Sequence, residues 1–187
     1  MIDKKAFPLE LQTSSRWMIW RLEDTVTKEG KERKRCKVPK QARHPERNAE
    51  STEPSTWASL DEALAALPSL EPSPQYKDEP NNRGVGLAVG PPYIGVDIDK
   101  VRDPATEETE QWAIDLMARY PATYTELSPS LRGFHLWFKG KAPDALKNGK
   151  RGSDLEVYPG GRYLTMTGLQ IDGTPDECTR LTDAQVM

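Results

Sequence analysis

Two aspartates, Asp97 and Asp99, stand one residue apart inside the apolar stretch 93–99. Side chains alternate between the two faces of a β-strand, so a strand here would carry both carboxylates on one face and the intervening apolar side chains on the other. Neighbouring carboxylates repel each other unless a cation lies between them, and Mg²⁺ binds one or two such groups together with water and phosphate oxygens. The pair therefore predicts a divalent-metal site for phosphate chemistry, with a solvated strand edge or a turn as the alternative.

Two later stretches repeat this alternation of apolar and polar side chains. Residues 133–138 would place His135 on the polar face of a strand, and residues 155–158 would place Glu156 on the polar face of another. If these strands are neighbours of the aspartate stretch, the four polar side chains converge on one open sheet face. Three carboxylates could then hold two metal ions about 3.5–4 Å apart, which suits phosphoryl transfer. A structural histidine and a surface glutamate are the alternatives for the two later residues.

Cationic and polar groups near these strands could bind phosphate. Arg132 and Arg162 each carry a planar guanidinium that can donate two hydrogen bonds to phosphate oxygens. The turn from Ser128 to Gly133 could add backbone N–H groups and a serine hydroxyl. A histidine on the same surface could donate to a triphosphate.

A strongly basic segment lies upstream, at residues 28–47. It contains nine lysines and arginines against three glutamates, whereas the whole chain has a formal net charge of −3. Such a local excess of positive charge is typical of a segment that contacts phosphates, here one that leads into a strand at residues 36–38. The alternative is a solvated hairpin tip around Glu29 and Gly30.

Several elements must position these residues. Large side chains on both faces predict a covered strand at 16–23. Leucines at helical spacing predict a helix over 51–67, capped by Ser55 or Thr56. The proline-rich stretch 68–82 predicts a boundary between lobes.

The second half of the chain is richer in strands. Further strands are expected at 85–89, 123–127 and 163–167, and a helix is expected at 104–119. This order of elements predicts an α+β fold in which helices cover one face of a sheet.

The composition limits the class of protein. At 187 residues, of which 36% are hydrophobic, the chain is long enough for one domain or for two small lobes with a shared core. Two cysteines far apart and two histidines do not suit a structural zinc site or a disulfide framework. The sequence has neither a signal-peptide stretch nor a run of about 20 apolar residues for a membrane span. We therefore expect a cytoplasmic protein without a membrane partner.

Three motifs carry a family resemblance. The stretches GVDIDK, SPSLRGFHLWFKG and LEVYPGGRYLTMTG resemble, in this order, the three motifs of the archaeo-eukaryotic primase superfamily. The likeness is to phage and plasmid primase-polymerases, whose catalytic core is a bifunctional DNA primase/polymerase N-terminal domain. The upstream stretches RWMIWR, CKVPK and STEPSTWASLDEALAAL resemble the same group. The likeness extends from Arg16 to Gly168.

The resemblance implies roles for individual residues. Asp97, Asp99 and Glu156 match the acids that bind Mg²⁺ or Mn²⁺, and His135 completes the implied catalytic set. Ser130, Arg132, His135 and Arg162 match positions that contact the incoming nucleotide. Leu131 departs from the pattern, because a glycine often follows the motif's serine. Leucine does not enter left-handed backbone cheaply, so we expect a differently shaped loop, which weakens the role of Ser130.

The resemblance also implies a fold and an activity. The implied fold is a two-lobe core, with a small N-terminal α/β unit (residues 1–82) packed on an RRM-like antiparallel sheet (residues 83–175) and a tail (residues 176–187). The implied activity is template-directed nucleotidyl transfer by a DNA primase and/or DNA polymerase, in a phage-infected or plasmid-bearing bacterial cell.

The implied partners are nucleic acid and nucleotides. These are a single-stranded DNA template, a primer, dNTPs or NTPs, and a helical priming domain or a helicase in the parent protein. The template would run along the basic segment, held through Lys34, Lys37 and Lys40. The alternatives are a non-catalytic nucleic-acid-binding replication-initiator domain, a metal-dependent nuclease, and a sugar-nucleotide transferase with a DxD motif.

Overall fold

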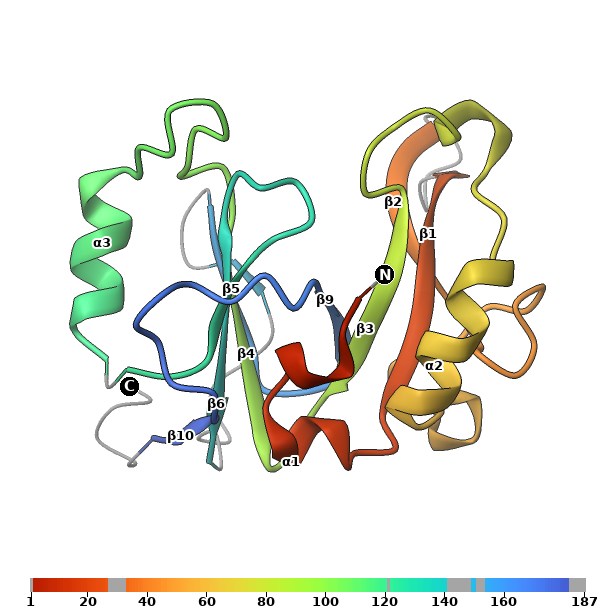
Figure 1. The fold of residues 1–187 in the computed structure, drawn as a ribbon, viewed down its shortest axis with the longest axis horizontal. Helices are drawn as coiled ribbons and strands as arrows, with labels where there is room; N and C mark the ends of the chain where they lie inside the picture. The colour runs from red at the N-terminus through yellow and green to blue at the C-terminus, as the bar shows by residue number, and fades with distance from the viewer. Residues whose placement is uncertain (1, 27–32, 121, 141–148, 151–153, 182–187) are drawn as a thin grey trace.

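The strands form two sheets that lie beside each other (Figure 1). The computed structural model describes residues 2–26, 33–120, 122–140, 149–150 and 154–181. In chain order, the elements are η1 (Lys4–Ala6), α1 (Leu9–Gln12), β1 (Trp17–Val26), β2 (Arg33–Lys40), η2 (Pro54–Thr56), α2 (Leu60–Ala66), η3 (Leu67–Ser69), η4 (Pro74–Tyr76), β3 (Arg83–Val89), β4 (Tyr93–Ile98), α3 (Gln111–Ala118), β5 (Thr125–Leu127), β6 (Phe134–Lys139), β7 (Gly149–Lys150), β8 (Leu155–Tyr158), β9 (Arg162–Met166) and β10 (Thr179–Arg180). The η elements are 3₁₀ helices.

Each sheet is mainly antiparallel. The first has the strand order β2-β1-β3-β9. The second has the order β10-β6-β4-β8-β7, with β5 paired to β6 as well. Only the short contact between β10 and β6 is parallel among the pairs in the described residues. The α+β class is confirmed.

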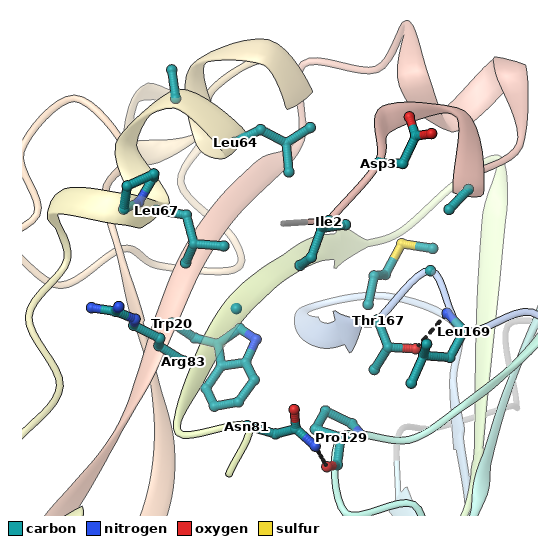
Figure 2. A pocket seen from close by; sticks show the side chains of 16 residues that line it. Ile2, Asp3, Trp20, Leu64, Leu67, Asn81, Arg83, Pro129, Thr167 and Leu169 are labelled. Carbon is teal, nitrogen blue, oxygen red and sulfur yellow. Dashed lines mark hydrogen bonds between the residues drawn. The ribbon is translucent and has the colours of Figure 1, made fainter. Parts of the chain in front are cut away.

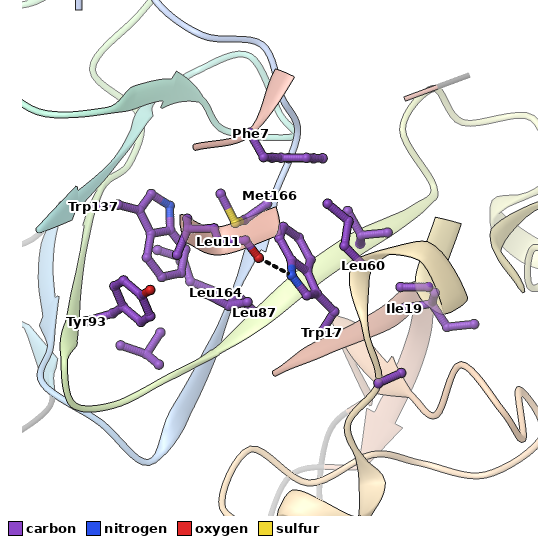
Figure 3. Packing of buried hydrophobic residues seen from close by; sticks show 14 of the residues in the cluster. Phe7, Leu11, Trp17, Ile19, Leu60, Leu87, Tyr93, Trp137, Leu164 and Met166 are labelled. Atoms are coloured by element: carbon purple, nitrogen blue, oxygen red, sulfur yellow. Dashed lines mark hydrogen bonds between the residues drawn. The ribbon is translucent and has the colours of Figure 1, made fainter. Parts of the chain in front are cut away.

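The main hydrophobic core lies where the first sheet meets α1, α2 and one face of the second sheet. Trp17 of β1 is fully buried there, and its indole N–H donates to the carbonyl oxygen of Leu11 at 2.8 Å. Figure 3 shows Trp137 and Tyr93 of the second sheet in the same cluster. Burial of large aromatic side chains from both sheets joins them into one core.

Among the described residues, other elements pack on both faces of the second sheet around its central strands. On one face, Ile94 and Phe134 pack with Ala113 of α3, which lies along the outer side of this sheet in Figure 1. On the other face, Trp137 is fully buried in the cluster that includes Leu164 of the first sheet. The face with the polar side chains is therefore not open along its whole length, because the first sheet covers its aromatic residues, whereas Asp97 and Glu156 remain partly exposed.

The boundaries of two helices differ from the expected ones. The helix expected from residue 104 begins at Gln111, because residues 103–110 form a turn closed by a bridge between Arg102 and Thr109. The helix expected over 51–67 is α2, and its cap is Ser59 rather than Ser55 or Thr56. Ser59 and Glu62 form a reciprocal capping box.

The division of the chain at residue 82 stays a prediction. The sheets divide the chain differently, since β3 and β9 pair with the sheet of β1. The hairpin tip around Glu29 and half of the expected tail, residues 182–187, lie outside the described residues. No helix in the described ranges is long and apolar enough to cross a membrane.

Candidate active site

Four polar side chains form a row across the second sheet. Asp97 on β4 is directly opposite His135 on β6 and directly opposite Glu156 on β8. His135 is in turn opposite Glu126 on β5. Residues directly opposite each other on antiparallel strands share a sheet face with Cβ atoms about 4.5–5.5 Å apart. The condition on which the convergence of the polar side chains depended is therefore met: β4 lies between β6 and β8.

His135 is the buried centre of this row. It is 1% exposed, and its Nε2 atom lies 3.6 Å from Oδ1 of Asp97. Its Nδ1 atom lies 3.5 Å from Oε1 of Glu126, which is 0% exposed. The imidazole therefore lies between two carboxylates.

Negative charge accumulates around Asp97. Burial raises the pKa of this carboxyl most, and the charges of Asp99 and Glu156 raise it further. The charges of His135 and Lys37 act in the opposite direction. A group of acids in this state favours a bound cation, because a cation would relieve the mutual repulsion.

Asp99 follows β4 directly and is fixed through its backbone. Its N–H donates to the carbonyl oxygen of Asp154 at 2.8 Å, and its Oδ1 atom accepts the N–H of Lys100 at 3.0 Å. The next two N–H groups in the chain, of Val101 and Arg102, donate to the carbonyl oxygen of Arg132 at 2.9 and 3.0 Å. The loop 128–133 thus lies against the end of β4 that carries Asp99.

Leu131 has left-handed backbone, with φ of 60°. Leucine therefore adopts here the left-handed backbone that is costly for a side chain with a Cβ atom. The loop holds the strained residue by two hydrogen bonds: the Leu131 N–H donates to Ser128 O at 2.9 Å, and Leu131 O accepts from the Arg102 guanidinium at 3.0 Å. The Ser130 hydroxyl lies 3.0 Å from that of Ser128 and accepts the Arg132 N–H at 3.3 Å, so it shapes the loop.

The two predicted phosphate-binding arginines line different pockets. Arg162 lines a pocket of about 540 Å³ together with Glu156, and Glu156 also accepts a hydrogen bond from the hydroxyl of Tyr158. Arg132 lines a pocket of about 380 Å³ with Lys100 and Arg102. The structure thus brings Arg162, but not Arg132, to the same pocket as a member of the acidic row.

The three predicted template lysines lie in different surroundings. Lys37 is close enough to Asp97 and Asp99 for both charges to raise its pKa, although burial lowers that pKa more. Its ammonium lies 5.8 Å from the ring centre of Trp20. Lys40 is 4% exposed and is bound at 2.8 Å to both Asn48 and Glu23. Lys34 is exposed.

The acidic row fits a magnesium or manganese ion in its chemistry. Asp97, Asp99 and Glu156 offer carboxylate oxygens, and Mg²⁺ needs only one or two of these beside water and phosphate oxygens. In the described part of the chain, no three histidine, cysteine or acidic side chains are grouped closely enough to hold a metal together. Asp97 and Asp99 are therefore the core of the candidate site, and Glu156 lies directly opposite Asp97 on β8.

A larger pocket of about 940 Å³ lies elsewhere. It is lined mainly by apolar side chains such as Leu64 and Leu169, with Trp20 at one side (Figure 2). Pro129 reaches it from the loop 128–133, where its carbonyl oxygen accepts the side-chain amide of Asn81 at 3.0 Å. None of the acids of the row lines this pocket, so its size does not make it the active site.

Glu126 was missed by reasoning from the sequence. The strand at 123–127 was expected, but this residue was assigned no role. The available signal was a single carboxylate on the same strand face as Tyr124, next to a stretch that carries a candidate histidine. Its partner across the sheet depends on strand pairing, which parity alone does not give.

Comparison with known proteins adds an independent observation. No family model matches the chain. The chain is 33% identical over 169 residues to the DNA primase-polymerase of Nitratiruptor phage NrS-1. The matched part covers 89% of this chain and 21% of that protein, so the chain spans about a fifth of the length of this relative.

Proposed function

Because this chain is related to a phage DNA primase-polymerase, we propose that it is a template-directed nucleotidyltransferase, a DNA primase and/or DNA polymerase. The observation that carries the proposal is the row of Asp97, His135 and Glu156 in direct register, with Asp99 at the end of the same strand. The row coincides with the three motifs on which the family resemblance rests.

In this proposal, Asp97 and Asp99 hold a divalent cation, with Glu156 as a third ligand. Mg²⁺ or Mn²⁺ bound there would stabilise charge on the phosphate oxygens during nucleotide addition. The chain itself would hold the metal ligands in place, since β4 and the loop 128–133 fix the backbone of the two aspartates before the substrates bind. Such preorganised electrostatics is the main source of catalysis in phosphoryl transfer.

Cationic side chains would bind the nucleotide. His135 presents Nε2 on the side of Asp97, where it would contact the triphosphate. Lys37 would add a positive charge, because its pKa is influenced by both aspartates. Arg162 would reach the nucleotide from the pocket that contains Glu156. Arg132 and Ser130 are proposed only as weaker contacts, since one lines another pocket and the other is bonded within its loop.

Of the three lysines predicted to bind the template, we keep only Lys34 in that role. Lys34 is exposed and remains a proposed contact to the phosphates of a single-stranded DNA template. Lys37 is proposed to serve the nucleotide rather than the template. Lys40 is no longer proposed as a template contact, because its ammonium is buried and already bound to Asn48 and Glu23.

The test is nucleotide addition on a single-stranded DNA template with Mg²⁺ or Mn²⁺, dNTPs or NTPs, and with or without a primer. We expect extension by the wild type and none by the double variant Asp97→Asn, Asp99→Asn. Asp115→Asn on α3 is the matched control and should remain active. Urea unfolding would verify that the double variant is folded.

Other outcomes would refute the proposal. Template binding without extension under every condition would indicate a non-catalytic replication-initiator domain. Cleavage of the strand in place of extension would indicate a metal-dependent nuclease. Extension by the double variant would refute the assignment of the metal site.

A further inference from the structure

Glu126 is a fully buried carboxylate beside His135. Its strand β5 pairs with β6 so that the two residues are directly opposite each other. The carboxylate is 0% exposed, and its Oε1 atom lies 3.5 Å from Nδ1 of His135. A buried carboxylate needs hydrogen-bond donors around it, so its remaining contacts indicate how it is held.

Three donors besides the histidine fix this carboxylate. The Gly168 N–H donates to Oε2 at 2.9 Å, and the Thr167 N–H lies 3.1 Å from both oxygens. The Tyr124 hydroxyl donates to Oε2 at 2.9 Å. Thr167 and Gly168 follow β9 of the first sheet, so the Glu126 side chain connects the second sheet to the first. Its orientation is therefore set by backbone groups.

Within the described part of the chain, the Nδ1 atom of His135 lacks a hydrogen-bond partner on the side of Glu126. Among the atoms of the described residues it is buried and forms no hydrogen bond at the observed geometry. A buried polar group without a partner is costly, and Oε1 of Glu126 is the acceptor that faces it. An ionised carboxylate only accepts hydrogen bonds, so Nδ1 must carry the proton for the two to bind. A shift of a few tenths of an ångström would complete the bond, and such bonds often tighten when substrate binds.

We propose that Glu126 is a positioning residue that binds the Nδ1–H group of His135 and thereby aims Nε2 at Asp97 and the bound nucleotide. The consequence for catalysis rests on the proposed function, but the hydrogen bond does not. Carboxylates that orient a functional histidine through its second nitrogen act in the same way in catalytic triads and metal sites. Loss of such an orienting partner lowers activity on the order of 10–100-fold.

The first experiment measures the Nδ1 proton directly, without any activity. The chain has two histidines, and the second, His44, is exposed, so long-range ¹H–¹⁵N correlation spectra should separate their signals. In the wild-type chain we expect Nδ1 of His135 to carry a proton. A spectrum in which this nitrogen is unprotonated would overturn the proposal, even if the chain adds nucleotides.

The second experiment is a double-mutant cycle in nucleotide addition. Glu126→Gln keeps the shape of the side chain and should lower kcat/KM for the nucleotide on the order of 10–100-fold. In a His135→Asn background, the same change should cost no more than about twofold, which is the usual error of additivity. A merely structural role would give the same loss in both backgrounds, and that result would overturn the proposal.

Thr123→Val is the matched control for this cycle. It removes a buried hydroxyl beside β5 that donates to the carbonyl oxygen of Trp137 and accepts the N–H of Thr179, and neither bond involves Glu126 or His135. We expect it to lower stability and to leave kcat/KM within about twofold of the wild type. If the wild type adds no nucleotide, the proposed function fails, while the ¹⁵N measurement still decides whether Nδ1 of His135 carries the proton that a hydrogen bond to Glu126 requires. The same measurement decides it if Glu126→Gln does not fold.

Discussion

Replacing Gly133 with alanine should disable the site while leaving the chain folded. A Cβ atom at this position would overlap the carbonyl oxygen of Ile98 and would lie 3.0 Å from the Cα atom of Asp99. Both are backbone atoms at the end of β4, so no side-chain rotation can relieve the overlap. The loop 128–133 and the backbone of Asp99 would have to move apart.

The size of the effect follows from these contacts. The overlap with the Ile98 oxygen is the more severe, and carbon and oxygen atoms in contact normally lie about 3.3–3.6 Å apart, so relief needs a displacement on the order of 1 Å or slightly more. Overpacking of this kind costs about 1–3 kcal/mol, against a total stability of about 5–15 kcal/mol for a typical domain. A misplacement of about 1 Å can lower a reaction rate by about 100-fold. We therefore expect Gly133→Ala to be folded and to add nucleotides about 100-fold more slowly than the wild type.

Gly173→Ala is the matched control for this prediction. Gly173 has φ of 80° and no atom within 4 Å of an added Cβ, so alanine there introduces backbone strain without a new contact. That strain should cost about 1–2 kcal/mol, close to the loss expected at Gly133. Urea unfolding would measure both stabilities, and primer extension would measure both rates. If the two variants are equally stable and equally active, the loop does not position Asp99 and the reasoning is refuted.

Three further predictions concern individual side chains. Lys40→Met removes the ion pair that the buried Lys40 ammonium forms with the partly exposed Glu23, and it should lower the free energy of unfolding in urea by about 1–3 kcal/mol. Lys34→Glu should reduce the salt slope of template binding, measured by fluorescence anisotropy, by about one, whereas Lys40→Met should leave this slope unchanged. The Arg43 guanidinium is the main cause that lowers the pKa of Glu62 to about 2, so the stability it contributes is present above the ordinary carboxyl pKa of 4.5 and is lost as the pH falls toward 2. Glu62→Gln should therefore be less stable than the wild type in urea at pH 7, and this difference should disappear near pH 2. Leu131→Gly should be more stable than Leu131→Ala by up to about 1 kcal/mol, the reverse of the usual order, because only alanine keeps the left-handed strain.

The alternation of residues predicted the polar row well. A β-strand has a period of two, and one strongly apolar face fixes which residues share the other face. Asp97, His135 and Glu156 therefore could be assigned to one face before the strand order was known. Their direct register is a property of strand pairing, which depends on contacts between distant parts of the chain.

The burial of this face was harder to predict from charge and polarity. Trp137 shares a face with His135, and Tyr93 shares one with Asp97, so aromatic residues on the polar face were the available sign of a second sheet. The parity argument was also not applied to β2. Lys37 and Lys40 are three residues apart, which places them on opposite faces of a strand, and the structure gives them different partners.

The start of α3 could not be located from proline alone. Pro104 is favourable at a helix start, but Glu107 has left-handed backbone with φ of 64°, and residues 103–110 form a turn. Hydrogen bonds close this turn, including one from the Glu107 N–H to Asp103 O at 2.8 Å. Such local bonds compete with helix formation, and no helical periodicity in the sequence reveals them.

The strands that carry the acidic residues are joined directly to strands of the first sheet. Two connections make this link, one between β3 and β4 and one between β8 and β9. The segment after β3 enters β4 with its aspartates, and the segment after β8 leaves Glu156 for β9. These two connections lie against each other, since a Cβ on Gly160 would be 3.5 Å from the Cα atom of Gly90. Repulsion among the carboxylates therefore acts on β4 and β8, the two strands of the second sheet that these connections join to the first sheet.

A divalent cation at the aspartates should for this reason stabilise the whole fold. A ligand that binds only the folded chain adds about 2.7 kcal/mol at a concentration 100 times its Kd. Mg²⁺ or Mn²⁺ should raise the Tm of the wild type measured in the absence of nucleotide and DNA. The double variant Asp97→Asn, Asp99→Asn should be insensitive to the metal, because both proposed ligands lose their charge. An equal rise in Tm for both proteins would mean that the cation binds elsewhere. The arrangement of Asp97 and Asp99 would then be a result of strand pairing and would not indicate a metal site.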